Sequence, residues 1–587
     1  MKPKKWVIGE RQGTEEEIKA LSEQLNISEV TAQLLYNRGY TTPASAFSFI
    51  SLDSERFHNP FRLDGMIAAT DRILTAIKNK EKIAIYGDYD VDGITSVCVM
   101  YLYLKSIGAD ISYYIPDRAS GYGVNKAALD GLISEGTELI VTVDTGITAI
   151  DEIAYAEEKG CDVVVTDHHE CRDVLPQCVA AINPRRQDSK YPLDELAGVG
   201  VALKLITALE FSLRKSLGEP TEGFINDICD SYIDLVAIGT IADVMPLTDE
   251  NRLIVRLGLA KMNRKKRPGI EALIEKFDKN AIKKPVNTQF IGYNIAPRLN
   301  AAGRMDSASV SVGLLLSDSK SEALSIAGFL NEANVRRREE ENSIVSDIDD
   351  MIVHDPSLAE KNVIVLSSDS WHQGVIGVAA SKVAEKYSKP TILITFDGDT
   401  GKGSGRSVEG FNLADALAYC ADMLTNYGGH ELAAGIKIER DMLDAFVSKI
   451  NSYAAVNTER SVPCVTADFE LKSDEISLRT ASELSLLEPY GFGNAVPQFA
   501  ARNLTVDSVT SLSNNAHTKL QLKHGKKNVT AMCFGMNHID LGFVGGDGVD
   551  IIFNLSVNDF MGRQSEQVIV REILPSHDTL LCAVEEN

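Results

Sequence analysis

Three apolar runs of this chain each end in side chains that can bind metal ions. The residues that follow them are Asp88, Asp90 and Asp92 after the first run, Asp144 after the second, and Asp167, His168 and His169 after the third. Carboxylate and imidazole ligands suit Mn²⁺ or Mg²⁺. Carboxylates that converge would repel one another strongly unless cations lay between them. We therefore expect a site for two cations about 3.5–4 Å apart, an arrangement that activates water and screens phosphate charge during hydrolysis.

The elements that must position these residues alternate between strand and helix. We predict strands over 82–86, 110–115, 139–143 and 161–166, and helices over 93–107, 124–134 and 149–159. Such alternation is typical of a parallel sheet with helices on both faces. Ligands of such sheets bind at the carboxyl ends of the strands, which is where the acidic residues and the histidine pair stand. A further carboxylate, Asp243, follows a predicted helix over 224–241.

The rest of the chain predicts three further regions. Residues 1–60 are predicted to be helical, and residues 320–353 to form one long helix that holds the charged run 336–341 on its polar side. A second β-α region follows, in which residues 398–405 form a glycine-rich loop. Short β-type segments beyond about residue 460 fit the strand count of an OB-fold barrel.

Length and composition are those of a globular protein with several domains. A chain of 587 residues, 44% hydrophobic and 24% charged, is too long for one core, and we expect three or four domains. No apolar stretch has the length of a membrane span, and the basic N-terminus lacks the apolar region of a signal peptide. The nine cysteines are dispersed, which indicates free thiols in a reducing cytoplasm.

The net charge of −24 does not exclude a nucleic-acid partner. A single strand occupies a groove, and only the groove must be basic. Basic clusters occur at 261–267, 336–338 and 523–527, although each by itself is typical of a solvated surface. Bound cations would offset part of the acidity.

Seven motifs in a fixed order resemble those of the DHH phosphoesterase family. Four are the acidic and histidine motifs described above, ending with Asp243, and three lie downstream at 297–305, 403–407 and 428–430. Together with the C-terminal β region, roughly residues 60–575 resemble the RecJ-type single-stranded-DNA exonucleases of that family.

The resemblance implies an α/β fold with several domains. A parallel-sheet DHH catalytic domain would be joined by a long helix to a smaller α/β DHH-associated domain, followed by a C-terminal OB-like β-barrel. The expected boundaries are 1–60 for an N-terminal helical segment, 61–318 for the DHH domain, 319–354 for the connecting helix, 355–457 for the DHH-associated domain, 458–577 for the nucleic-acid-binding barrel and 578–587 for a tail.

Carried over residue by residue, the resemblance implies a metal site. The implied ligands are Asp88, Asp90, Asp92, Asp144, His168 and Asp243, with Asp144 as the bridge. Asp88 stands where some relatives carry histidine. His169 would contact the scissile phosphate or, alternatively, serve as a ligand, and Asp167 would either orient a histidine or cap the strand end. Arg304 is expected to take part in catalysis beside them.

The resemblance also implies a substrate site. Its expected members are Arg118, Asn300, Ser404, Arg406 and His430. Ser404 and Arg406 resemble a pocket for a 5′-phosphate, because glycine-flanked backbone approaches a phosphate closely and arginine forks onto its oxygens. Arg118 resembles a third member of that pocket, with a surface ion pair as an equal alternative.

The implied function is that of a metal-dependent 5′-to-3′ exonuclease that hydrolyses single-stranded DNA to 5′ mononucleotides by a two-metal-ion mechanism, in DNA repair and recombination. Its cofactors would be two Mn²⁺ or Mg²⁺ ions. Beyond single-stranded DNA, the expected partners are a single-strand-binding protein and a helicase, and the protein would be a cytoplasmic monomer without membrane contact.

Two alternatives stay open. One is a different DHH enzyme, an oligoribonuclease or a cyclic-dinucleotide phosphodiesterase. The other is a non-catalytic replication scaffold. The C-terminal β region argues against the first, and the complete set of acidic and histidine residues argues against the second.

Overall fold

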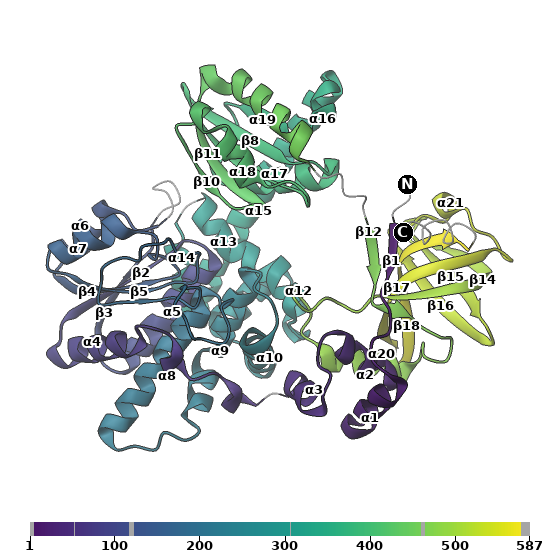
Figure 1. Cartoon of the computed structure of the whole chain (residues 1–587), viewed down its shortest axis with the longest axis horizontal. Helices are drawn as coiled ribbons and strands as arrows, with labels where there is room; N and C mark the ends of the chain where they lie inside the picture. Colours follow the sequence, from purple (N-terminus) through teal and green to yellow (C-terminus); the bar gives the residue numbers. More distant parts are fainter. Residues whose placement is uncertain are drawn as a thin grey trace. The chain divides into compact units, whose positions relative to one another are not determined.

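The structure is a computed structural model that describes residues 5–51, 53–116, 123–305, 307–458, 464–560 and 562–576. The chain forms two compact units, each built from separated segments (Figure 1). The larger unit contains Glu55–Met245 and Leu257–Ser461. The barrel unit contains Met1–Ser54, Pro246–Arg256 and Val462–Asn587.

The first sheet of the larger unit is parallel throughout. Its strands are β2 (Lys82–Gly87), β3 (Asp110–Tyr114), β4 (Thr137–Val143), β5 (Asp162–Thr166) and β6 (Ala180–Ile182). Their order is β3-β2-β4-β5-β6, which confirms the predicted parallel sheet. Because every strand runs in the same direction, all their carboxyl ends lie along one edge.

Helices cover both faces of this sheet (Figure 1). On one face lie α6 (Lys126–Ser134) and α7 (Ile150–Glu158). On the other lie α4 (Met66–Asn79), α5 (Val91–Ser106) and α8 (Gly198–Leu217). Buried on both sides, the strands are almost wholly apolar, as parallel strands usually are.

A helical region follows the first sheet. It comprises α9 (Phe224–Ala242), α10 (Asp249–Arg264), α11 (Pro268–Phe277), α13 (Ala296–Met305), α14 (Ser309–Leu316) and α15 (Lys320–His354). The long helix predicted over 320–353 is therefore confirmed as α15. The expectation that its charged run lies on a polar side is wrong for two residues. Arg337 and Glu341 are buried and pair with each other at 2.9 Å, because α15 packs against other helices along its length.

The second sheet of the larger unit has the strand order β10-β11-β9-β8-β7. The strands are β7 (Ile364–Ser368), β8 (Thr391–Asp397), β9 (Thr400–Arg406), β10 (Asn426–Gly429) and β11 (Ala433–Glu439). α17 (Gln373–Tyr387) and α15 pack on one face. α18 (Leu413–Tyr419) and α19 (Leu443–Asn457) pack on the other.

The predicted loop at 398–405 is wrong, since most of it is the central strand β9. Glycines usually weaken strands, which is why the sequence suggested a loop. Here neighbouring side chains leave no room for anything larger. A Cβ atom at Gly403 would lie 2.6 Å from Ile436 and 3.0 Å from Ile394, both on adjacent strands.

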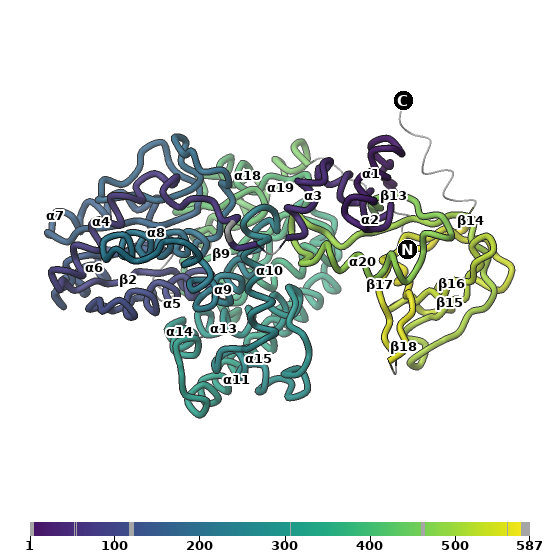
Figure 2. The backbone as a smooth tube through the Cα atoms, turned by 90° about the horizontal axis from the view of Figure 1, so that it is seen from below, coloured from purple at the N-terminus to yellow at the C-terminus, as the bar shows by residue number. Residues whose placement is uncertain are grey.

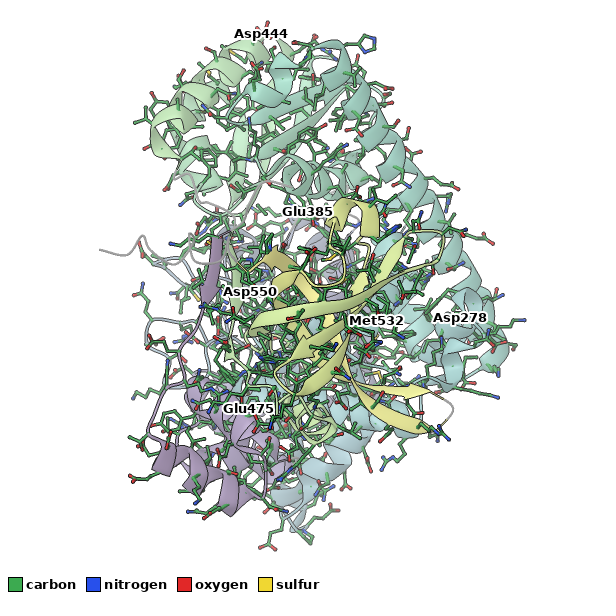
Figure 3. All side chains as sticks on the ribbon, turned by 90° about the vertical axis from the view of Figure 1, so that its right-hand side faces the viewer. Asp278, Glu385, Asp444, Glu475, Met532 and Asp550 are labelled. Atoms are coloured by element: carbon green, nitrogen blue, oxygen red, sulfur yellow. The ribbon has the colours of Figure 1, made fainter. Side chains whose placement is uncertain are left out.

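The barrel unit is built around five strands that close on themselves. They are β14 (Phe499–Leu512), β15 (His517–His524), β16 (Lys527–Phe534), β17 (Gly548–Phe560) and β18 (Arg563–Pro575), and pairing of β14 with β17 closes the barrel. Figure 3 looks onto this unit, with Met532 of β16 and Asp550 of β17 labelled. The barrel confirms the expected OB-like fold.

The N-terminal segment belongs to the core of the barrel unit. α1 (Glu15–Leu25), α2 (Glu29–Asn37) and α3 (Pro43–Ile50) bury apolar residues in one cluster with residues of the barrel strands. Figure 2 follows the backbone of these helices and of the barrel strands. The prediction of a purely helical segment missed strand β1 (Lys5–Ile8), which pairs with β12 (Cys464–Ala467). A four-residue strand has too little periodicity to be recognised without its distant partner.

No disulfide bond joins any two of the eight cysteines in the described ranges, in keeping with the expected free thiols. None of the helices described is both long and apolar enough to cross a membrane.

Candidate metal centre

The first motif runs from the end of β2 into the first turn of α5, and backbone N–H groups of that turn hold Asp90. Asp88 directly follows β2 and is 2% exposed. Asp90 caps α5, and its Oδ1 accepts hydrogen bonds from the backbone N–H groups of Asp92 at 2.9 Å and Gly93 at 3.1 Å. Glycine is needed at 93, because a Cβ atom there would lie 2.4 Å from the carbonyl oxygen of Asp88.

Asp92 and Asp144 meet at the start of α8. The two carboxylate oxygens of Asp92 accept backbone hydrogen bonds from Gly198 at 2.6 Å and Val199 at 3.0 Å. The N-terminus of a helix is favourable for a negative charge. A Cβ atom at Gly198 would lie 2.6 Å from the Asp144 side chain, so the absence of a side chain lets α8 approach the site. Asp144 itself has φ = 59°, a strained conformation for a residue other than glycine.

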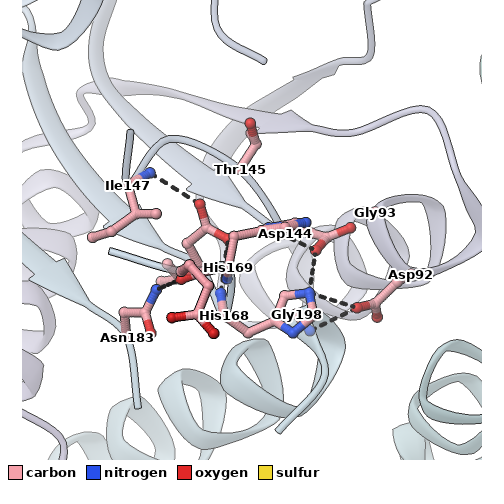
Figure 4. A network of polar contacts seen from close by, with 12 residues as sticks. Asp92, Gly93, Asp144, Thr145, Ile147, His168, His169, Asn183 and Gly198 are labelled. Carbon is pink, nitrogen blue, oxygen red and sulfur yellow. Dashed lines mark hydrogen bonds and ion pairs between the residues drawn. The ribbon is translucent and has the colours of Figure 1, made fainter. Parts of the chain in front are cut away.

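Asp167 organises the histidine pair, which Figure 4 shows with Asp144 and Ile147 around it. Its Oδ1 accepts hydrogen bonds from the backbone N–H groups of His168 and His169 and lies 2.7 Å from Nδ1 of the His169 ring. Its Oδ2 accepts a hydrogen bond from the N–H of Ile147 at 2.9 Å. Asp167 thus both caps the end of β5 and orients His169, so the two roles considered for it coexist.

The His168 ring faces three carboxylates. Its Nε2 lies 3.2 Å from Oδ1 of Asp144, 3.6 Å from Oδ2 of Asp243 and 3.8 Å from Oδ2 of Asp92. Asp243 reaches this position from the C-terminal end of α9. The residue after it, Val244, has φ = 56°. For a β-branched side chain this conformation is strained, as backbone at functional sites often is.

Burial and mutual repulsion perturb the titration of this cluster. Burial first, and then the neighbouring carboxylates, raise the pKa values of Asp92 and Asp144 well above their usual range. Burial followed by the charge of Asp90 raises the pKa of Asp243 to about 7. Burial lowers the pKa of His168 to about 3. The His168 ring is therefore neutral, and its short distances to carboxylates are not ion pairs.

His169 has the opposite charge state. Burial alone would lower its pKa, but the hydrogen bond with Asp167 and the surrounding negative charges raise it to about 9. Burial alone would raise the pKa of Asp167, but the same hydrogen bond, the charge of His169 and the N–H group of Ile147 together lower it. At neutral pH the pair therefore combines a neutral ring with a cationic one.

The donor set fits divalent cations. The buried Oδ1 of Asp144 has no hydrogen-bond partner among the described residues. Two ligands at right angles around an ion, each about 2.1 Å away, are about 3 Å apart, which is close to the 3.2 Å between this oxygen and Nε2 of His168. Among the residues that the structure describes, three groups have ligand atoms within 4.8 Å of one another: Asp144, His168 and His169; Asp92, His168 and Asp243; and Asp88, Asp90 and Asp144.

Asn300 and Arg304 lie on α13, which packs against the first motif. A Cβ atom at Gly303 would lie 3.0 Å from the carbonyl oxygen of Tyr89. The buried Oδ1 of Asn300 has no hydrogen-bond partner within the described ranges. Nη1 of Arg304 donates to the carbonyl oxygen of Gly374 at 3.1 Å, at the start of α17.

The remaining predicted substrate residues lie on the second sheet. Ser404 and Arg406 point to the same face of β9, with Nη1 of Arg406 at 3.2 Å from the Ser404 hydroxyl. His430 is exposed and directly follows β10. The prediction for Arg118 falls outside the described residues.

Comparison with known proteins identifies the family of this chain. Residues 82–240 match the DHH family N-terminal domain, 360–456 the DHHA1 domain and 467–572 the RecJ OB domain. The single-stranded-DNA-specific exonuclease RecJ of Bacillus subtilis is 36% identical over 564 residues, which cover 95% of this chain and 69% of that protein. Its counterpart from Haemophilus influenzae is 34% identical, covering 88% of this chain and 92% of the other.

The chain belongs to the RecJ family. RecJ from Thermus thermophilus in complex with Mn²⁺ has the same fold, with a TM-score of 0.82 and 28% identity over 98% of this chain and 80% of that one. A second solved structure, of exonuclease RecJ bound to manganese, is 33% identical with a TM-score of 0.56 and covers 68% of this chain and 96% of that chain.

Two residues beside the histidine pair of this RecJ chain, Asn183 and Arg185, were not predicted from the sequence. The buried Asn183 donates a hydrogen bond to the carbonyl oxygen of His169 at 2.9 Å and accepts one from the N–H of Arg185 at 2.8 Å. Arg185 pairs with Glu170 at 2.6 Å, and its charge helps to lower the pKa of His168 and offsets part of the rise in the pKa of Asp243. The sequence feature that could have indicated Asn183 is its position, because it directly follows the three-residue strand β6.

Proposed function

We propose that this protein is a metal-dependent exonuclease that degrades single-stranded DNA from its 5′ end and releases 5′ mononucleotides, in DNA repair and recombination. The observation that carries the proposal is the buried cluster in which neutral His168 faces Asp92, Asp144 and Asp243. Such a cluster is electrostatically unfavourable unless cations bind in it. The proposed ligands are Asp88, Asp90, Asp92, Asp144, His168 and Asp243, with Asp144 shared between two ions.

When bound, Mn²⁺ or Mg²⁺ would supply Lewis acidity toward phosphoryl oxygens and lower the pKa of a water molecule. The chain's own residues supply orientation and charge. Hydrogen bonds from α8 hold Asp92, and those from α5 hold Asp90. Asp167 binds Nδ1 of His169 and orients the cationic ring, whose positive charge would stabilise negative charge on the scissile phosphate.

The direction of degradation would be set on the second sheet. Ser404 and Arg406 present a hydroxyl and a guanidinium group on one face of β9, a combination suited to a terminal phosphate. We assign Asn300, Arg304 and His430 to the path of the strand between this pocket and the metal centre, and Arg118 to the pocket itself. In catalysis Arg304 would act beside His169 as a second cation.

The barrel would bind the single strand further from its end, as OB-folds do. A single-strand-binding protein and a helicase are the proposed partners, because both supply single strands to such an enzyme. We propose that the protein works as a monomer in the cytoplasm.

The direct test is digestion of DNA and RNA labelled at either end, in single- and double-stranded form, with Mn²⁺ or Mg²⁺. We expect labelled mononucleotides to appear at once only from single-stranded DNA labelled at its 5′ end. An Asp144→Ala variant serves as the control for contaminating nucleases. Immediate release of a 3′ label, or internal fragments, would contradict the proposed polarity.

A further inference from the structure

The second sheet of the larger unit carries a shallow hollow that the proposed catalytic residues do not use. It has a volume of about 310 Å³ and lies over β9, β10 and β11 at the start of α17. Its rim includes Gln373, Lys402, Asn426, Tyr427 and Lys437. All of these residues belong to one unit of the protein.

The floor of the hollow is bare backbone. Strand register places Ser404, Gly435 and Gly428 side by side on the face that α17 covers over β8 and β9. A Cβ atom at Gly428 would have nothing within 4 Å, and one at Gly435 would approach only the carbonyl oxygen of Gly403, at 3.9 Å. Neither glycine is required by packing, and both leave space into which a ligand can come close to the sheet.

Two lysines stand directly opposite each other at the edge of this floor. Lys402 of β9 pairs in register with Lys437 of β11. Like charges at directly opposed positions destabilise an antiparallel pair. Lys402 donates to the amide oxygen of Gln373 at 3.3 Å. Within the described part of the chain, neither ammonium group forms an ion pair with a carboxylate. A bound anion would remove the repulsion between them.

The hollow continues the proposed pocket for the terminal phosphate. Lys402, Ser404 and Arg406 alternate along one face of β9, so that neighbouring members are about 7 Å apart along the strand. The positive side chains therefore form a row, and Lys437 widens it at one end. A ligand that placed one phosphate at Arg406 could place another beside the lysines.

We propose that this hollow is a second phosphate-binding site, in which Lys402 and Lys437 hold a phosphate linked to the one at Ser404 and Arg406. The identity of the ligand as DNA rests on the proposed function, whereas anion binding does not. The phosphate could come from a 5′-triphosphate end or from the backbone of the adjoining nucleotide. Both sources share the same chemistry, and the substrate series below separates them.

The test compares binding by the full-length protein in EDTA, so that no hydrolysis occurs. The probes are fluorescent oligothymidylates of one length that carry a 5′-hydroxyl, 5′-monophosphate or 5′-triphosphate group, and the readout is anisotropy at several salt concentrations. The key variant is Lys402→Gln with Lys437→Gln. The control, Lys386→Gln with Lys449→Gln, removes the same charge from lysines that pair with Asp349 and Asp422 elsewhere on this domain.

We expect the key variant to bind about 5- to 20-fold more weakly. If both contacts are to phosphate, the slope of log affinity against log salt should fall by about 1.4, or 0.7 for each lost contact. A loss confined to the triphosphate probe assigns the site to the 5′ end, and an equal loss for all probes assigns it to the backbone. Lys402→Arg with Lys437→Arg should restore binding.

Affinity within twofold of wild type for all three probes, with an unchanged salt slope, would overturn the proposal. Equal weakening by the control variant would also overturn it, because the effect would then be one of net charge. Since binding is measured without turnover, either result leaves the proposed nuclease activity to its own test. Thermal unfolding of each variant verifies that the fold is retained.

Discussion

Replacing Asp243 by asparagine should stabilise the metal-free protein while impairing the metal centre. Burial and the charge of Asp90 raise the pKa of Asp243 from the usual 3.8 to about 7 in the folded chain. The ionised side chain therefore destabilises the native state when no cation is present. An asparagine at this position would keep the size of the side chain and remove its charge.

The size and sign of the effect follow from the pKa. Because the folded pKa is raised, the stability that this group contributes is fully present below about pH 4 and is lost as the pH rises toward 7. Each pKa unit corresponds to about 1.4 kcal/mol, so a rise of roughly three units costs about 4 kcal/mol above pH 7. This is an upper bound, since the carboxylates titrate together and rearrangement relieves part of the repulsion.

The assay is denaturant unfolding of wild type and Asp243→Asn in EDTA between pH 4.5 and 8.5. The variant should gain up to about 4 kcal/mol over wild type at pH 8, and much less near pH 4.5. Adding Mn²⁺ should stabilise wild type more than the variant, because binding to the native state adds to stability. Asp151→Asn, at an exposed position on α7, serves as the control and should show no such trend.

A variant no more stable than wild type at pH 8 in EDTA would refute the reasoning. It would mean that the carboxylates do not repel one another in the folded protein. The electrostatic case for cations at this site would then fall.

Four further outcomes are expected. Asp144→Ala should lower hydrolysis at least 100-fold while single-strand binding survives, and retained turnover in Mn²⁺ would contradict the ligand assignment. Arg406→Ala should reduce the preference for a 5′-phosphorylated strand about 10-fold, and an unchanged preference in competition assays would remove it from the pocket. Gly198→Ala should lower the free energy of unfolding by about 1–3 kcal/mol and reduce activity, because the added methyl group displaces Asp144. Gly131→Ala, whose Cβ atom would meet nothing within 4 Å, should change neither stability nor activity. Deleting residues 464–587 should cause aggregation, because apolar residues of the N-terminal helices share the barrel core; a monodisperse product in size-exclusion chromatography would count against that shared core.

Much of the first sheet could be predicted because its signals are local. Apolar strands alternating with helices specify a parallel sheet, and parallel strands end at one edge. Asp88, Asp144 and Asp167 stand at those ends in the sequence, and the structure places them there. Strand β9 was missed because glycine is read as loop, and only Ile394 and Ile436 on neighbouring strands show why nothing larger fits.

The charge states of the two adjacent histidines could not be predicted from the sequence. His168 and His169 are adjacent and chemically identical, yet the pKa of one falls to about 3 and that of the other rises to about 9. The difference arises because burial and the neighbouring cationic His169 lower the pKa of His168, whereas Asp167 binds the ring of His169 and raises its pKa.

Short segments of the chain are enough to indicate which ligand types this protein offers, in which order, and at the ends of which strands. Side-chain chemistry and strand or helix periodicity are properties of such segments. Which of these groups are buried, how far apart they lie and which are charged follow from the folded arrangement. Those quantities depend on residues brought together from distant parts of the chain, such as Gly198 against Asp144, and on the water that their packing excludes.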